Sequence, residues 1–292
     1  MFLSLKGSLN TKFPRFKGIL DSYAGASAAY SLRKLSSSTS NVVRVRRSSD
    51  NAEQDFTASE VSDGTLESFC GVGDGFVVTW YDQSGNGNDA VQATTTSQPK
   101  IVDGGSLVAG GIDFDGVNDL LEVLDPMTNA QGLSLFLVAN IDDGQSNSMI
   151  VRHGQANPEN AWNFQIATDS GNPLGVVRCS TGTISTSTAE KYITAGGSVD
   201  NFGALSLYGL NLQDGVGRAI FVNGSSLSLT RPFGSDQSST FNSTEVLSIG
   251  ANSDTSLPIQ MAARELIIYD SDQSANRTAI EGNINAHYNI YP

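Results

Sequence analysis

Short runs of apolar and β-branched residues recur along most of this chain, and Gly, Asn, Asp or Ser stand between them. Runs of about four to eight such residues, bounded by turn residues, are typical of β-strands. Asn223-Gly224 follows one run directly and indicates a tight hairpin. In a chain of 292 residues, strands at this spacing predict an all-β, jelly-roll β-sandwich. The expected strands cover residues 42–46, 75–81, 112–115, 120–123, 133–140, 149–152, 162–167, 175–179, 204–210, 217–222, 246–250 and 263–269.

Three segments have helical patterns instead. Residues 21–35 are rich in Ala and follow a possible cap at Asp21 or Ser22, which favours a helix. A short helix is expected around 64–70. A third is expected at about 274–287, where Ile280 and Ile284 lie on one stripe. Since no repeat or linker interrupts residues 21–292, we expect them to form one domain behind an arm of residues 1–20.

The arm mixes apolar and basic side chains and is too apolar for a solvated tail. We expect it to pack on a neighbouring subunit, which implies a homo-oligomer or a larger assembly; packing on its own domain is the alternative. The residues expected to make these contacts are Phe2, Leu5, Lys6, Phe13, Arg15, Phe16 and Lys17.

Charge is distributed unevenly along the chain. Residues 1–47 hold nine Lys or Arg and one acid, which gives this segment a net charge of +8. Because the whole chain has a net charge of −13, the remaining residues have a net charge of −21. An acidic body argues against nucleic acid as a partner, because phosphate binding requires concentrated positive charge. No apolar run is long enough to span a membrane, and no secretory signal is evident. We therefore expect synthesis in a cytoplasm.

A specific family resemblance lies in the first third of the chain. Residues 30–35, 43–51 and 79–90 resemble the start of the catalytic domain of family 54 α-L-arabinofuranosidases, most clearly in the run Tyr81-Asp82-Gln83-Ser84-Gly85-Asn86-Gly87. Residues 112–121, 220–224, 248–250 and 265–270 resemble the concanavalin A/laminin-G jelly roll. Similar blocks, and the closing segment 279–288, occur in structural proteins of tailed phages. The resemblance implies a concanavalin A-like sandwich with short flanking helices near the N-terminus and one C-terminal helix.

The resemblance also implies that the family's catalytic groups are missing. Its acid/base Asp follows an Ile-Gly-Gly run, whereas here Asn252 follows Ile249-Gly250-Ala251. Its nucleophilic Glu lies on a mid-chain strand, whereas here no acid occurs between Asp169 and Glu190. Because retaining glycosidases need two carboxylates, we expect a chain that is not an enzyme. The alternative is an active arabinofuranosidase in which Asp254 replaces Asn252, with Glu159 or Asp169 as its partner.

Two further sets of side chains are candidates for ligand binding. Tyr81, Trp162, Asn252 and Asp254 are expected to contact a glycan, since rings stack on sugars and polar side chains bind hydroxyls; core packing is the alternative for the aromatic residues. Asp113, Asp115, Asn118 and Asp119 offer oxygen ligands for Ca²⁺, although an ordinary Asx turn explains them equally well. No other cofactor is expected.

Together these observations predict a phage virion protein. It would be an outward-facing jelly roll on the capsid or tail, anchored to other virion proteins by its arm and able to bind a host-surface glycan. A carbohydrate-binding adhesion module is the alternative.

Overall fold

The computed structural model describes residues 15–124, 132–142, 148–154, 162–169, 172–181, 190–194, 202–213, 217–233 and 246–292. The strands in these ranges pair antiparallel throughout. They are β1 (Ala26–Ser31), β2 (Asn41–Arg47), β3 (Glu53–Thr57), β4 (Gly75–Trp80), β5 (Ala90–Val91), β6 (Lys100–Asp103), β7 (Ser106–Leu107), β8 (Ile112–Asp115), β9 (Leu121–Val123), β10 (Gly132–Ile141), β11 (Ser148–His153), β12 (Trp162–Asp169), β13 (Asn172–Thr181), β14 (Glu190–Thr194), β15 (Leu205–Gln213), β16 (Gly217–Val222), β17 (Ser225–Ser226), β18 (Leu229–Phe233), β19 (Leu247–Ile249) and β20 (Gln260–Tyr269). The helices are α1 (Ala58–Ser62), α2 (Thr65–Cys70) and α3 (Arg277–Tyr288), with a 3₁₀ turn at Thr95–Ser97.

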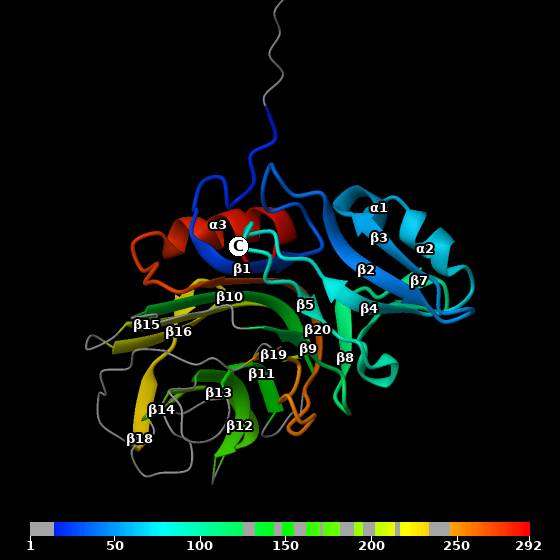
Figure 1. Ribbon diagram of the computed structural model, residues 1–292. Helices are drawn as coiled ribbons and strands as arrows, with labels where there is room; N and C mark the ends of the chain where they lie inside the picture. The colour runs from blue at the N-terminus through cyan, green and yellow to red at the C-terminus, as the bar shows by residue number, and fades with distance from the viewer. Residues whose placement is uncertain are drawn as a thin grey trace, which may run out of the picture.

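The strands are arranged in two layers (Figure 1). One layer has the order β16, β15, β10, β20, β1, and α3 covers its outer face. The other has the order β9, β19, β11, β12, β13, β14, β18. Strands β8, β6, β4 and β5 join the two along one side. This arrangement confirms the predicted all-β jelly-roll sandwich.

Strand β10 shows why the middle of the molecule is so apolar. Leu133, Leu135 and Leu137 point into the core between the layers. The alternate residues Phe136 and Val138 belong to a second cluster that includes residues of α3. A strand that is buried on both faces reads as a continuous apolar run rather than an alternating one.

The predicted helix over residues 21–35 is wrong. Its centre is β1, which pairs with β20 along its whole length and is buried throughout. Ala28 and Tyr30 face the core between the layers, whereas Ala26 and Ala29 face the cluster under α3. Alanine has only a weak intrinsic preference for helix, and pairing with the edge of β20 overrides it because that pairing buries both faces.

The other two predicted helices are confirmed as α2 and α3. Leu66 and Cys70 are buried in α2, and Ile280 and Ile284 form the buried stripe of α3. The sequence missed α1, although Thr57 and Glu60 form a capping box at its start.

Only the end of the N-terminal arm lies within the described residues. Arg15 is exposed there. The Phe16 side chain is 53% exposed, and the Lys34 ammonium lies 5.6 Å from the centre of its ring. Phe2, Leu5, Lys6 and Phe13 lie outside the described residues. No helix in the described part of the chain is long and apolar enough to cross a membrane.

Candidate functional site

The loop after β4, which carries the most specific sequence motif, is fastened to β1 by its own side chains. The Asp82 carboxylate accepts hydrogen bonds from the backbone N–H groups of Ala29 (2.8 Å), Ser84 (2.9 Å) and Asn88 (3.1 Å). The Asn86 and Asn88 amides donate to the Ser27 carbonyl at 3.1 and 2.7 Å. These side-chain-to-backbone bonds make the turn rigid.

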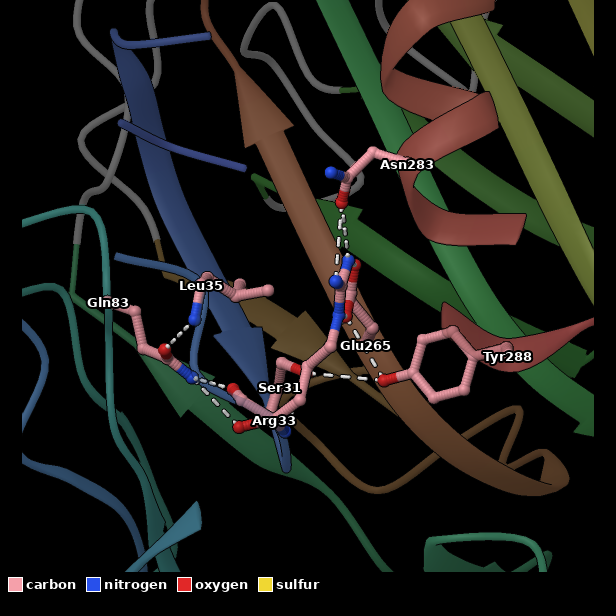
Figure 2. Close-up of polar contacts among 7 residues, drawn as sticks. All are labelled: Ser31, Arg33, Leu35, Gln83, Glu265, Asn283 and Tyr288. Atoms are coloured by element: carbon pink, nitrogen blue, oxygen red, sulfur yellow. Dashed lines mark hydrogen bonds and ion pairs between the residues drawn. The ribbon is translucent and has the colours of Figure 1, made fainter. Parts of the chain in front are cut away.

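Gln83 ties the same loop to the chain that follows β1 (Figure 2). Its Oε1 accepts from the Leu35 N–H at 2.7 Å, and its Nε2 donates to the carbonyls of Ser31 (2.9 Å) and Arg33 (3.0 Å). The side chain is 4% exposed. The loop is therefore held in place before any ligand arrives.

A small polar hollow of about 230 Å³ opens beside this loop, and we call it the Tyr81 hollow. Its lining consists of hydroxyl, amide and carboxylate side chains, one glycine and the Tyr81 ring. The lining residues are Ser38, Thr39, Ser40, Asn41, Tyr81, Asp82, Gln83 and Gly85. The Thr39 hydroxyl has no hydrogen-bond partner among the described residues. Such a lining suits a small polyhydroxylated ligand, because hydroxyls need both donors and acceptors.

Tyr81 is fixed at the edge of this hollow. Its hydroxyl donates to Asp55 Oδ1 at 2.7 Å, and Asp55 also receives two bonds from the Arg44 guanidinium, at 2.6 and 3.0 Å. Partial burial and the neighbouring Asp55 carboxylate raise the pKa of Tyr81 to about 12. The phenol is therefore protonated and oriented at neutral pH, and the half-buried ring keeps part of its surface accessible.

Asn252 and Asp254 lie in a different cluster, on the β19–β20 connection. Figure 1 shows this connection far from the loop between β4 and β5. Asn252 Oδ1 accepts from Arg152 Nη1 at 2.9 Å, and Asn252 Nδ2 donates to Ser256 Oγ at 2.9 Å. Arg152 Nε also donates to the Gly154 carbonyl at 2.8 Å. Burial lowers the pKa of the Arg152 guanidinium, and the nearby Asp254 carboxylate opposes that shift.

The Asp254 side chain is exposed, and its Oδ1 accepts hydrogen bonds from the Ser256 hydroxyl and N–H. These bonds lower the pKa of Asp254, so the group is ionised at neutral pH. Glu159, one suggested partner, lies outside the described residues, and the side chain of Asp169, the other, is also not described.

The structure corrects the role expected for Trp162. The indole is 0% exposed and packs in the core beside the fully buried His153, with ring centres 6.2 Å apart. A ring that is completely buried has no free face to stack on a sugar, so Trp162 acts as a core anchor.

Three of the candidate Ca²⁺ ligands, Asp115, Asn118 and Asp119, form hydrogen bonds that stabilise the turn between β8 and β9. Asp115 Oδ1 accepts from the N–H groups of Val117 (2.8 Å) and Asn118 (3.2 Å), and Asp119 Oδ2 accepts from the Asp115 N–H (3.1 Å). Asn118 donates to the Thr96 carbonyl at 2.7 Å. Asp113 lies on the adjoining strand, where burial and Asp142 raise its pKa. Among the described residues, no group of three or more His, Cys, Asp or Glu side chains is placed to hold a metal ion.

Asp119 is buried, unlike the exposed Asp115 of the same turn. Its side chain is 7% exposed, and burial raises its pKa to about 6. Its carbonyl packs against Gly250, where a Cβ would lie 3.0 Å away. Asp119 therefore lies beside the end of β19, from which the segment carrying Asp254 continues, and the pKa values of the two groups shift in opposite directions.

Solved structures of arabinofuranosidases match this chain across most of its length. A family 54 α-L-arabinofuranosidase soaked with a cyclic sulfate inhibitor gives a TM-score of 0.68 at 16% identity, covering 89% of this chain and 62% of that one. A substituted family 54 enzyme soaked with 4-nitrophenyl α-L-arabinofuranoside gives 0.65 at 18% identity, with the same coverage. An arabinofuranosidase complexed with arabinofuranosyl-α-1,2-xylobiose gives 0.57 at 14% identity.

The chain shares the fold of the family 54 α-L-arabinofuranosidases. It spans 62% of the length of each of these three matched structures. No family model and no curated protein sequence matches it. The resemblance expected from residues 30–90 is thus confirmed at the level of the fold, which is a glycosidase-like β-sandwich.

The prediction that the chain is not an enzyme is contradicted by this comparison, because each of the three matched folds is that of an arabinofuranosidase. The prediction relied on carboxylates missing at motif positions in the sequence. Such an argument does not consider carboxylates that lie in other segments of the chain.

Proposed function

We propose that this protein binds carbohydrate and that the Tyr81 hollow is its contact site. The observation that carries the proposal is the Tyr81 ring, whose hydroxyl is fixed by Asp55 at the edge of a hollow lined with hydroxyl, amide and carboxylate groups. Sugar sites combine an apolar ring face with a few well-placed polar groups. Because the loop is already fastened to β1, little ordering is needed on binding.

Arabinofuranosyl oligosaccharides are the first ligands to test, since two matched structures contain an arabinofuranoside. Calorimetric titration with arabinofuranosyl-xylobiose is expected to show saturable binding by the full chain. Tyr81→Ala is expected to weaken it by about tenfold or more, as loss of a stacked ring does. Tyr81→Phe keeps the ring and is expected to lose less.

Phe16→Ala is the matched control, because it removes an exposed ring that lies outside the hollow. Equal affinity in the wild type and Tyr81→Ala would place binding elsewhere, and no saturable binding of any pentose or hexose oligosaccharide would refute the proposal.

Glycoside hydrolysis is a second candidate function, favoured by the arabinofuranosidase fold of the matched structures. The reaction needs two carboxyl groups, one protonated and one ionised. Asp119, whose pKa is raised to about 6, is a candidate for the acid, and the ionised Asp254 is a candidate for the other group. Release of 4-nitrophenol from 4-nitrophenyl α-L-arabinofuranoside tests this. Activity is expected to fall about 100-fold or more in Asp119→Asn and in Asp254→Asn, and turnover that neither variant reduces would exclude the pair.

The role in a virus particle stays a prediction of the sequence, because neither the fold nor the matched structures supports it. Anchoring by the arm, oligomerisation and exposure on a virion surface likewise stay predictions. Quantitative mass spectrometry of purified particles is the direct test, and absence of the chain from virions would end that hypothesis.

A further inference from the structure

A second and larger pocket, of about 580 Å³, lies where the N-terminal segment meets the domain. Its walls come from residues 16–19, the β1–β2 connection, α1, the segments around β6 and β7, and α3. Much of the lining is apolar and includes Ile19, Leu32, Val61, Ile101 and Leu107. This volume falls in the range that small-molecule sites occupy.

The charged side chains of this pocket all have one sign. Lys17, Arg33, Lys34 and Arg264 line it together with His287, and no Asp or Glu is among the lining residues. This is unusual in a chain with a net charge of −13. The pocket is therefore an apolar space with a positive rim on an acidic protein.

Three of these cations, Lys17, Lys34 and Arg264, have no carboxylate partner in the described part of the chain. Arg33 is neutralised by Glu265, as Figure 2 shows. The Lys34 ammonium, by contrast, faces only the Phe16 ring at 5.6 Å. Arg264 donates to the carbonyls of Gly110 (3.1 Å) and Ala109 and lies 5.9 Å from the centre of the Tyr288 ring.

The surroundings of His287 are consistent with a positive pocket. Burial lowers the pKa of this imidazole, the charges of Arg33 and Arg264 lower it further, and the Glu265 carboxylate opposes these shifts. A cation is thus disfavoured here, whereas an anion would be stabilised by the same charges.

This electrostatic pattern decides among the possible occupants. The apolar arm of a second copy is disfavoured, because residues 1–14 contain Lys6 and Lys12 and no acid. An uncharged apolar molecule would leave the positive rim without a partner.

We propose that the pocket binds a small amphiphile of the fatty-acid class, with its hydrocarbon chain among Leu32, Val61 and Leu107 and its carboxylate against Lys34 and Arg264. This site is separate from the Tyr81 hollow and does not depend on the proposed function.

The test is calorimetric titration of the full chain with decanoate, with decanol and propionate as matched ligands. Decanoate is expected to bind at least about fivefold more tightly than decanol, which lacks the charge, and than propionate, which lacks the chain. Lys34→Gln is expected to weaken decanoate binding about fivefold, while Lys34→Arg retains it. Ala109→Trp, which places a large side chain in the pocket, is expected to abolish binding.

Lys100→Gln is the control for loss of a lysine outside this pocket and is expected to change nothing. Decanoate binding equal to that of decanol would overturn the charge argument, and unchanged binding in Ala109→Trp would overturn the assignment of the pocket. Tight binding of an acidic, apolar peptide without any binding of decanoate would show that the pocket is a protein-docking site instead.

Discussion

Arg33 and Glu265 form a bidentate ion pair in which the Glu265 carboxylate is completely buried. Arg33 Nε lies 2.7 Å from Glu265 Oε2, and Arg33 Nη2 lies 2.9 Å from Oε1. Ser31 and Tyr288 donate their hydroxyls to the same Oε2, at 2.9 and 3.1 Å (Figure 2). One carboxylate on β20 thus connects the end of β1, the segment after it and the last turn of α3.

Removing one partner of this pair is expected to be costly. Arg33→Met should lower the free energy of unfolding by about 3–5 kcal/mol, because it leaves a buried carboxylate without its cation. Arg47→Met, which breaks the more exposed pair of Arg47 with Asp50, should cost much less, because solvent screens that pair. Urea denaturation of the two variants measures the difference.

The double variant Arg33→Met/Glu265→Leu separates the charge from the packing. If the uncompensated carboxylate causes the loss, the double variant should be more stable than Arg33→Met alone. A double variant that is less stable than the single one would instead show that the side-chain network as a whole fixes β1 and α3.

Asp82 is expected to control the rigidity of the β4–β5 loop. Asp82→Ala removes the acceptor of the Ala29 N–H and of two further backbone N–H groups, so the stability should fall by about 1–3 kcal/mol. Hydrogen exchange at Ala29 and Asn88 should also accelerate. Asp103→Ala removes an exposed carboxylate and should change neither the stability nor the hydrogen exchange. Similar exchange rates in the two variants would show that Asp82 does not hold the β4–β5 loop on β1.

Asp119 should make the protein less stable as the pH rises. Its pKa is raised from 3.8 to about 6 by burial, so between these values the folded state holds a proton that the unfolded state has lost. Stability should therefore fall from about pH 4 to pH 6 and the penalty should then remain constant.

Asp119→Asn keeps an acceptor for the Asp115 N–H and removes this penalty. The variant should be about 3 kcal/mol more stable than the wild type at pH 7 and no more stable at pH 3.5. Thermal denaturation of the variant and the wild type between pH 3.5 and pH 7 measures this difference in stability. Asp270→Asn, at an exposed position, should leave the pH profile unchanged.

Gly250 should tolerate no side chain. Its φ is +96°, and a Cβ would lie 2.3 Å from the Phe114 ring, so Gly250→Ala should cost roughly 3 kcal/mol or more. Gly203 has a similar φ of +79° with nothing within 4 Å, and Gly203→Ala should cost only about 1 kcal/mol. Equal losses in the two variants would show that backbone conformation alone decides.

The sequence was a good guide wherever local chemistry decides the structure. Short apolar runs bounded by Gly or Asn turns predicted most of the strands, and the motif from Tyr81 to Gly87 predicted the arabinofuranosidase fold. The same local arguments were wrong for residues 21–35, since an alanine-rich segment forms a helix or a strand according to what it packs against. The sequence was equally unable to decide the role of Trp162. An aromatic side chain packs in the core when both ring faces are covered and can stack on a sugar when one face is exposed.

The sequence by itself therefore determined the strands and turns of the β-sandwich and the two later helices, because each of these depends on residues close together in the chain. Only the tertiary structure decided which side chains meet. It placed Tyr81 against Asp55, Arg33 against Glu265, and the carbonyl of Asp119 against Gly250. The physical reason is that charge, burial and ligand geometry depend on contacts between distant segments, and those contacts exist only after the layers have packed.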